Sequence, residues 1–157
     1  MAIRNATADD IDGMVDLAES FRARLAHYST VFWRPAPDAN ERQSTWFRML
    51  LGFEDVIALL DDDGSALRGF IVGRLTVAPP VYAPGGPVCL IDDFCVGSDG
   101  QWATTGHALV EAIETQARSR GAVLLVVICA HHDAAKRAFL GTTRFAVTAE
   151  WHVRGLE

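Results

Sequence analysis

The sequence predicts an α/β fold in which one strand pair runs parallel and another forms an antiparallel hairpin. Residues 88–96 are apolar and β-branched apart from two carboxylates, and a polar break follows at residues 97–100. From Thr104 the apolar residues fall at helical spacing as far as Gly121, and residues 122–130 are an unbroken apolar run. Such a run predicts a strand buried on both faces. A strand-loop-helix-strand unit of this length places its two strands parallel, with a right-handed crossover.

The antiparallel hairpin is predicted from residues 56–77. Residues 56–60 read as one strand, Asp61-Asp-Asp-Gly64 as a turn, and residues 66–77 as a longer strand. An Asp-Gly turn between two apolar runs is a strong local hairpin signal.

The remaining elements are predicted from weaker sequence patterns. Residues 2–7 suit a short edge strand, and apolar positions spaced from Ile11 to Leu25 predict a helix. A second helix is expected at residues 41–51, after an aromatic, Pro-interrupted loop at residues 27–40. We expect a short helix at residues 133–140 and a last strand or strand pair at residues 145–153.

Composition narrows the class of protein. A chain of 157 residues suits one domain, which we expect to span residues 1–157, and its net charge of -6 argues against nucleic-acid binding. No apolar run approaches the roughly 20 residues of a membrane span, and the N-terminus lacks the apolar core of a signal peptide. The three cysteines lie in strand-like runs without metal-ligand spacing, which favours buried thiols, no metal site and a cytoplasmic location.

The polar break before the third helix is a candidate anion site. A loop that opens a helix presents free backbone N–H groups at the positive end of the helix dipole, and Thr104 and Thr105 add hydroxyl donors. The alternative is an ordinary N-capped helix, because Ser and Thr caps are common.

Two stretches carry a family resemblance that covers essentially the whole chain. IDDFCVGSDGQWATTGHALVEAIETQARSRGA resembles the acetyl-CoA motif of GCN5-related N-acetyltransferases (GNAT), with Gln101 and Gly106 at the first and last positions of its Arg/Gln-x-x-Gly-x-Gly/Ala core. AAKRAFLGTTRF resembles the closing segment of that family, Asn-x-x-Ala-x-x-Phe-Tyr followed by Gly-Phe. The acidic pair before Phe-x-Val is most similar to the diamine-type acetyltransferases.

The resemblance implies a fold and an activity. The fold is a central mixed, mainly antiparallel sheet with one parallel strand pair and helices on both faces. The activity is acetyl transfer from acetyl-CoA to a primary amine of a small molecule or peptide. The resemblance is also compatible with a homodimer. The resemblance also implies cofactor-binding positions at Phe94, Cys95, Val96, Gln101, Trp102, Ala103, Thr104, Thr105, Gly106 and Asp133.

The sequence departs from the motif at positions that matter for catalysis. Trp102 and Thr104 replace glycines, Asp133 replaces Asn, and Leu140 stands where the family often has a general-acid Tyr. These departures favour an alternative, a catalytically inactive GNAT-fold protein that binds acyl-CoA as a sensor or serves as an interaction module. We expect the Trp102 indole to pack outward, because an indole inside the loop would displace the anion.

Asp92 and Asp93 are the candidate catalytic carboxylates. Acetylating an amine requires loss of a proton, which a carboxylate with a raised pKa takes directly or through a water. Adjacent strand residues face opposite ways, so at most one carboxylate projects into a given cleft, and by position we place Asp92 ahead of Asp93. Solvation of a strand end or a salt bridge is the alternative role. By resemblance, Tyr28, Trp33 and Tyr82 lie in loops that cover the acceptor.

Overall fold

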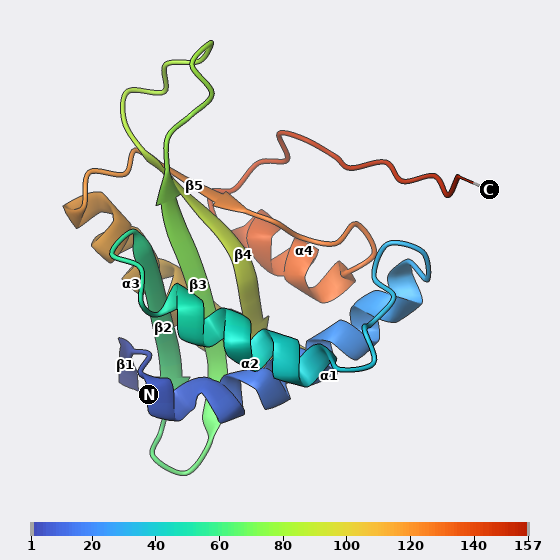
Figure 1. The fold of residues 1–157 in the computed structure, drawn as a ribbon. Helices are drawn as coiled ribbons and strands as arrows, with labels where there is room; N and C mark the ends of the chain where they lie inside the picture. The colour runs from blue at the N-terminus through green and yellow to red at the C-terminus, as the bar shows by residue number, and fades with distance from the viewer. Residues whose placement is uncertain (1, 157) are drawn as a thin grey trace.

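The computed structural model describes residues 2–156 and shows a five-stranded sheet with helices on both faces (Figure 1). The strands follow one another in the order β1-β2-β3-β4-β5, antiparallel except for the parallel pair β4–β5. The strands are β1 (Ala2–Asn5), β2 (Val56–Asp62), β3 (Leu67–Thr76), β4 (Val88–Val96) and β5 (Leu124–Val127). The helices are α1 (Ile11–Tyr28), α2 (Ala39–Leu50), α3 (His107–Ser119) and α4 (Ala134–Thr142), with a short 3₁₀ turn at Ala8–Asp10. The predicted fold class is therefore confirmed.

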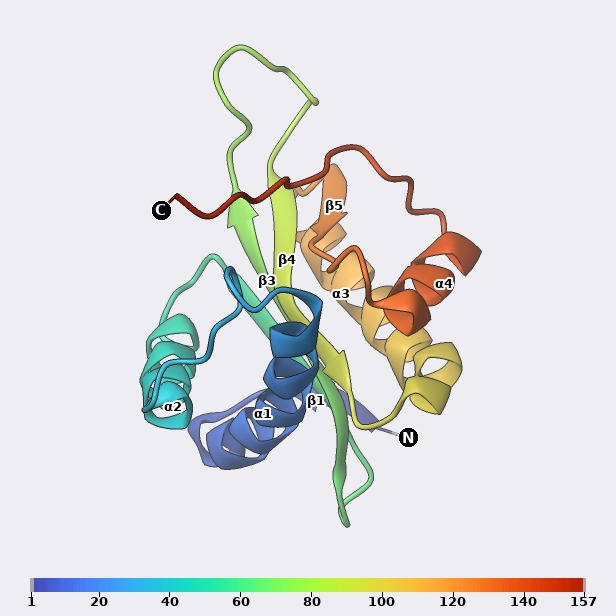
Figure 2. The ribbon, with the colours of Figure 1, turned by 90° about the vertical axis from the view of Figure 1, so that its right-hand side faces the viewer.

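Two apolar layers lie on the two faces of the sheet (Figure 2). On one face α1 and α2 cover the sheet with Met14, Phe47 and Phe70 among the buried residues. On the other face α3 and α4 cover it, and Ile113 and Phe139 are buried there. Side chains from both faces of the central strands contribute to the two layers, which is why these strands are mainly apolar.

The β2–β3 hairpin forms as predicted, but its turn lies further along the chain. Strand β2 continues through Asp61 to Asp62, and Gly64 has the positive φ of 83° that an L side chain rarely adopts. The Asp62 side chain accepts a hydrogen bond of 2.7 Å from the Gly64 N–H. Asp61, expected in the turn, is completely buried in the strand.

Strand β5 differs from its prediction in length and burial. It spans only four residues, and Leu124 and Val126 are exposed, because β5 is the edge strand of the sheet and one of its faces is open. The expectation of a strand buried on both faces is therefore wrong. An apolar run does not distinguish a central strand from an edge strand, because sheet order depends on the whole topology.

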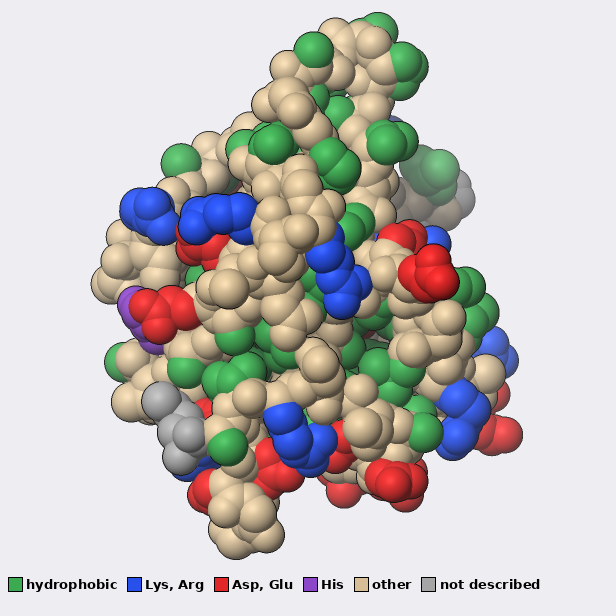
Figure 3. Space-filling model, turned by 90° about the vertical axis from the view of Figure 1, so that its left-hand side faces the viewer, with side chains coloured by type: hydrophobic (Ala, Val, Ile, Leu, Met, Phe, Trp, Pro, Cys, Tyr) green, Lys and Arg blue, Asp and Glu red, His purple; other side chains and the backbone are tan. Residues whose placement is uncertain are grey.

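The expected last strand is also wrong. Residues 143–156 contain no helix or strand, and Val147 and Trp151 are among their exposed side chains. The loop between β3 and β4 is likewise irregular and projects from the body of the molecule, with hydrophobic side chains on its surface (Figure 3). None of the helices found among residues 2–156 has the length and apolar character needed to cross a bilayer.

Candidate functional site

A β-bulge in β4 sets the directions of the two candidate carboxylates. Val72 pairs with Asp93 and Gly73 pairs with Ile91, which leaves Asp92 as an extra residue without a partner in β3. Ile91 and Phe94, three residues apart, consequently pack in the same layer beneath α3. The expectation of strict alternation along this strand is therefore wrong. Asp92 is exposed at the bulge, whereas Asp93 is partly buried.

Asp93 lies on the α1/α2 face, since its cross-strand partner Val72 and its neighbour Cys95 both belong to that layer. Burial is the largest cause that raises the pKa of the Asp93 carboxyl to about 6, and the negative charge of Asp92 acts in the same direction. Lys136 and Arg22 act in the opposite direction, but they do not outweigh burial. Asp93 therefore changes its protonation near neutral pH, as a general base requires.

Strands β4 and β5 separate just beyond this carboxylate. Their parallel pairing ends at Ile91 and Val127, with one further hydrogen bond of 3.0 Å from the Ile128 N–H to the Ile91 carbonyl. The β5 edge of residues 94–96 therefore has no strand beside it, and these are the β4 positions expected to bind a cofactor. Phe94, Trp102, Lys136 and Phe139 lie buried where the two strands separate, and we call this region the β4–β5 opening.

Lys136 reaches into the β4–β5 opening from α4 and is only 1% exposed. Its Nζ donates hydrogen bonds of 3.0 Å to the Phe94 carbonyl and 3.2 Å to the Ile128 carbonyl. The rings of Phe21, Phe94 and Trp102 surround Nζ, with centroids 5.2–5.8 Å away. Sequence reasoning missed this residue, although a signal existed: among 14 Lys and Arg residues, Lys136 is the only lysine.

Trp102 packs inward, so the expectation that its indole faces outward is wrong. The side chain is 3% exposed; its ring stacks on Phe139 at 5.3 Å and meets Phe94 edge-on at 5.0 Å. Gly106 permits this arrangement, because a Cβ there would lie 2.9 Å from Trp102 Cε3. The indole Nε1 is buried without a hydrogen-bond acceptor among the described residues.

The segment before α3 is helical earlier than expected. A 3₁₀ turn covers Asp99–Gln101 and a π turn covers Trp102–Gly106, where the sequence predicted a loop until Thr104. The Gln101 side chain accepts a hydrogen bond of 2.9 Å from the Ser98 N–H and so caps the turn. Gly100, Ala103 and Thr104 are exposed, and they leave the outer side of the helix start uncovered by large side chains. Single π turns are often associated with functional sites.

Two further expected cofactor positions have internal partners. The Thr105 hydroxyl is buried and donates a 2.8 Å hydrogen bond to Asp61 Oδ2, while Arg68 donates a 2.6 Å hydrogen bond to Asp61 Oδ1. Asp133 is buried at the N-cap of α4, where its side chain accepts a 3.1 Å hydrogen bond from the Lys136 N–H. Thr105 and Asp133 therefore hold the helix starts in place.

Burial also raises the pKa of the Cys95 thiol to about 12, which makes it a poor nucleophile.

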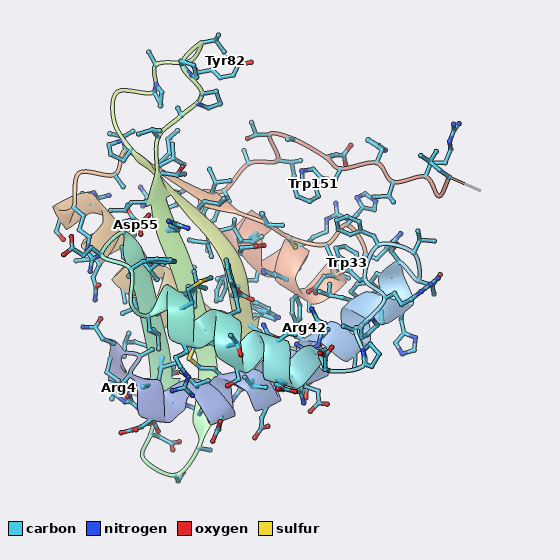
Figure 4. All side chains as sticks on the ribbon, in the orientation of Figure 1. Arg4, Trp33, Arg42, Asp55, Tyr82 and Trp151 are labelled. Atoms are coloured by element: carbon cyan, nitrogen blue, oxygen red, sulfur yellow. The ribbon has the colours of Figure 1, made fainter. Side chains whose placement is uncertain are left out.

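Aromatic side chains gather at the loop end of α1. The Tyr28 ring lies 6.3 Å from that of His132, and Phe32 meets Trp151 edge-on at 6.0 Å. Trp33 and Trp151 lie on the same side of the molecule, whereas Tyr82 is at the tip of the projecting loop and far from them (Figure 4). The structure thus groups Tyr28 with Trp33 and separates Tyr82.

Among residues 2–156 there is no group of three or more His, Cys, Asp or Glu that could hold a metal ion.

Solved structures share this fold at low sequence identity. A variant of the BH1408 protein from Bacillus halodurans is 18% identical, with a TM-score of 0.85 over 100% of both chains. A predicted acetyltransferase with acetyl-CoA from Clostridium acetobutylicum is 15% identical, with a TM-score of 0.73 over 98% of this chain and 95% of its own. An aminoglycoside 6'-N-acetyltransferase from Acinetobacter haemolyticus is 12% identical, with a TM-score of 0.75 over 100% and 99%. No family model and no curated protein sequence matches the chain. The chain therefore has the fold of GNAT acetyltransferases.

Proposed function

We propose that this protein transfers an acetyl group from acetyl-CoA to a primary amine, with Asp93 as the general base. The observation that carries the proposal is the partly buried Asp93 carboxyl, whose pKa is raised to about 6, beside the β4–β5 opening. A base of this pKa is ionised at neutral pH and still accepts a proton readily. Asp92, which the sequence placed first, is exposed at the bulge and is the weaker candidate.

The residues present suit acetyl-CoA in two places. Gly100, Ala103 and Thr104 leave the helix start accessible to a pyrophosphate, and the positive end of the dipole attracts it. Inside the β4–β5 opening, Trp102 Nε1 is a buried donor that lacks an acceptor, and the carbonyls of a pantetheine arm are acceptors. Acetyl-CoA, when bound, supplies the activated acetyl group as a thioester.

The protein's own residues accept and donate the protons of the reaction. An amine at neutral pH arrives mainly as an ammonium ion, which has no free electron pair. Asp93 takes a proton from the nitrogen, directly or through a water, so that the nitrogen pair forms the new bond to the acetyl carbon. As the bond from that carbon to sulfur breaks, the sulfur keeps its electron pair and needs a proton.

The acceptor proposed is an amine that carries positive charge or an aromatic or apolar group. Asp93 supplies negative charge on the α1/α2 face, with Asp92 exposed at the bulge beside it, and the Tyr28, Trp33 and Trp151 rings lie at the loop end of α1. Aromatic faces bind both apolar groups and cations. Polyamines, amino sugars and peptide N-termini are the classes to assay first.

A thermal scan and an amine panel test the proposal together. Saturation with acetyl-CoA at about 100 times its dissociation constant should stabilise the protein by about 2.7 kcal/mol, visible as a rise in melting temperature. Acetyl transfer should then be detected by mass spectrometry with at least one amine of the panel. A protein that acetyl-CoA does not stabilise at millimolar concentration would contradict the proposal.

A second candidate function is an acyl-CoA-binding protein without catalysis. The observation that favours it is Leu140, which occupies the position of the family's frequent general acid and brings no proton donor. Stabilisation by acetyl-CoA without turnover of any amine would support this candidate over the first.

A further inference from the structure

We propose that Lys136 is the proton donor to the sulfur in this reaction and takes the role that Leu140 cannot fill. The inference rests on the proposed function and adds a second catalytic residue at the edge of β4 that faces β5. Lys136 and Leu140 are four residues apart on α4, so their side chains leave the same face of the helix. A lysine one turn earlier therefore reaches towards the same space as a tyrosine at residue 140.

The surroundings of Lys136 differ from those of a structural ion pair. Its Nζ has two acceptors, both backbone carbonyls, one on β4 and one just after β5. An ammonium group has three N–H donors, so one remains for a ligand that enters the β4–β5 opening. No salt bridge joins Lys136 to a carboxylate among the described residues, and a buried charge without such a partner is costly. Costly buried charges are retained more readily when they have a function.

Lysine, unlike arginine, can give up its proton. Burial lowers the pKa of Lys136, while the aromatic rings and the two carbonyls favour the protonated form. The other 13 of the 14 Lys and Arg residues are arginines, which stay charged in proteins. Among the 14 Lys and Arg side chains, the one that can release its proton is thus the one between β4 and β5.

The proton balance of the step is complete with residues already named. Lys136 donates one proton to the sulfur as the bond from sulfur to the acetyl carbon breaks, and a thiol leaves. Asp93 has taken one proton from the ammonium, the nitrogen loses its second proton to water as the amide forms, and the neutral Lys136 regains a proton from Asp93 through water or from solvent. The net reaction releases one proton for each ammonium acetylated.

Other ionisable groups face Lys136 and must be considered in any titration. They come from β4, from the segment after β5 and from the start of α4: Asp93, Cys95, Cys129 and Asp133. Arg22 and Arg24 of α1 act on Asp93 and Cys95 in turn. A comparison of two ligands that differ only in the thiol keeps all these groups constant.

The single lysine makes a direct experiment possible. Protein labelled with ¹³C-lysine gives one side-chain signal, whose pH titration reports Lys136 in the complexes with CoA and with desulfo-CoA. With CoA, the thiolate should raise the midpoint of this titration by about one pH unit or more over the desulfo-CoA complex. Equal midpoints with both ligands bound would overturn the inference and leave the proposed function standing. If neither ligand binds, the proposed function fails as well.

Binding of the same two ligands to the Lys136→Met variant is an independent test. Isothermal titration at pH 8 should show CoA binding about tenfold more tightly than desulfo-CoA to the unsubstituted protein and equally to Lys136→Met. Arg137→Met, the same change at the exposed neighbour, should keep the tenfold difference. If Lys136→Met tightened both ligands alike, the lysine would be a plug in the opening, and the inference would be wrong. The titration of the unsubstituted protein decides the question if Lys136→Met does not fold.

Discussion

Asp93 and Lys136 are two charged groups beside strand β4, and their surroundings differ. Asp93 has few polar contacts on the α1/α2 face, and burial together with the charge of Asp92 raises its pKa to about 6. Lys136, in the β4–β5 opening, has two carbonyl acceptors and three aromatic rings around its Nζ. These two surroundings are the physical basis for the proposed base at Asp93 and the proposed acid at Lys136.

The first prediction concerns Asp93, the proposed general base. Asp93→Asn should lower acetyl transfer by about 10²–10⁴-fold, the usual contribution of a general base, with little change in acetyl-CoA affinity. The rate of the unsubstituted protein should rise with pH through about 6, because Asp93 must be ionised, and Asp93→Asn should lose that rise. Asp92→Asn is the matched control. Full activity in Asp93→Asn with loss in Asp92→Asn would reverse the assignment.

The second prediction concerns the packing of Trp102 beside Lys136. Trp102→Ala should lower the free energy of unfolding by about 3–5 kcal/mol, because it empties a buried site between Phe94 and Phe139. Denaturant unfolding measures the change. Trp151→Ala, at a side chain 72% exposed, should change it by less than about 0.5 kcal/mol. Equal effects of the two changes would show that Trp102 does not pack as described.

The third prediction concerns the contact that holds the helix start to the hairpin. Thr105→Val keeps the side-chain shape but removes the hydrogen bond to the buried Asp61, which should cost about 1–3 kcal/mol of unfolding free energy. Thr104→Val, one residue earlier and exposed, should be nearly neutral in chemical denaturation. If both changes were neutral, the Asp61 contact would contribute no stability.

The fourth and smallest effect is a pH dependence of stability. The folded pKa of Asp93, about 6, lies above the value of about 3.9 expected in the unfolded chain, so folding binds this proton more tightly. The protonated carboxyl therefore stabilises the fold below about pH 3.9, and this contribution is lost as the pH rises through 6. Asp93→Asn should be more stable than the unsubstituted protein by about 1–2 kcal/mol at pH 8 but not at pH 4. Thermal melts at the two pH values measure it, and the same difference at both would contradict the pKa.

The sequence alone determined the elements that rest on local patterns. The bounds of β4, and the presence and order of the β2–β3 hairpin and the helices α1 to α4, follow from apolar periodicity and from turn residues such as Gly64, which act over a few residues. The sequence also singled out the acidic pair of β4 as candidate carboxylates, because the pair interrupts an apolar strand, and their catalytic role stays a prediction. Local patterns did not reveal the bulge at Asp92, because a bulge is a mismatch between two strands.

The tertiary structure decided which residues share a space. Trp102 turned inward because Phe94 and Phe139, from β4 and α4, form a buried site that the indole fills. Lys136 became notable only when α4 placed it against the carbonyls of Phe94 and Ile128. Residues 145–153 alternate as a strand does, yet they lie unpaired, since a strand needs hydrogen-bond partners as well as a pattern. Long-range contacts fix these features, and their free energy depends on residues far apart in the chain.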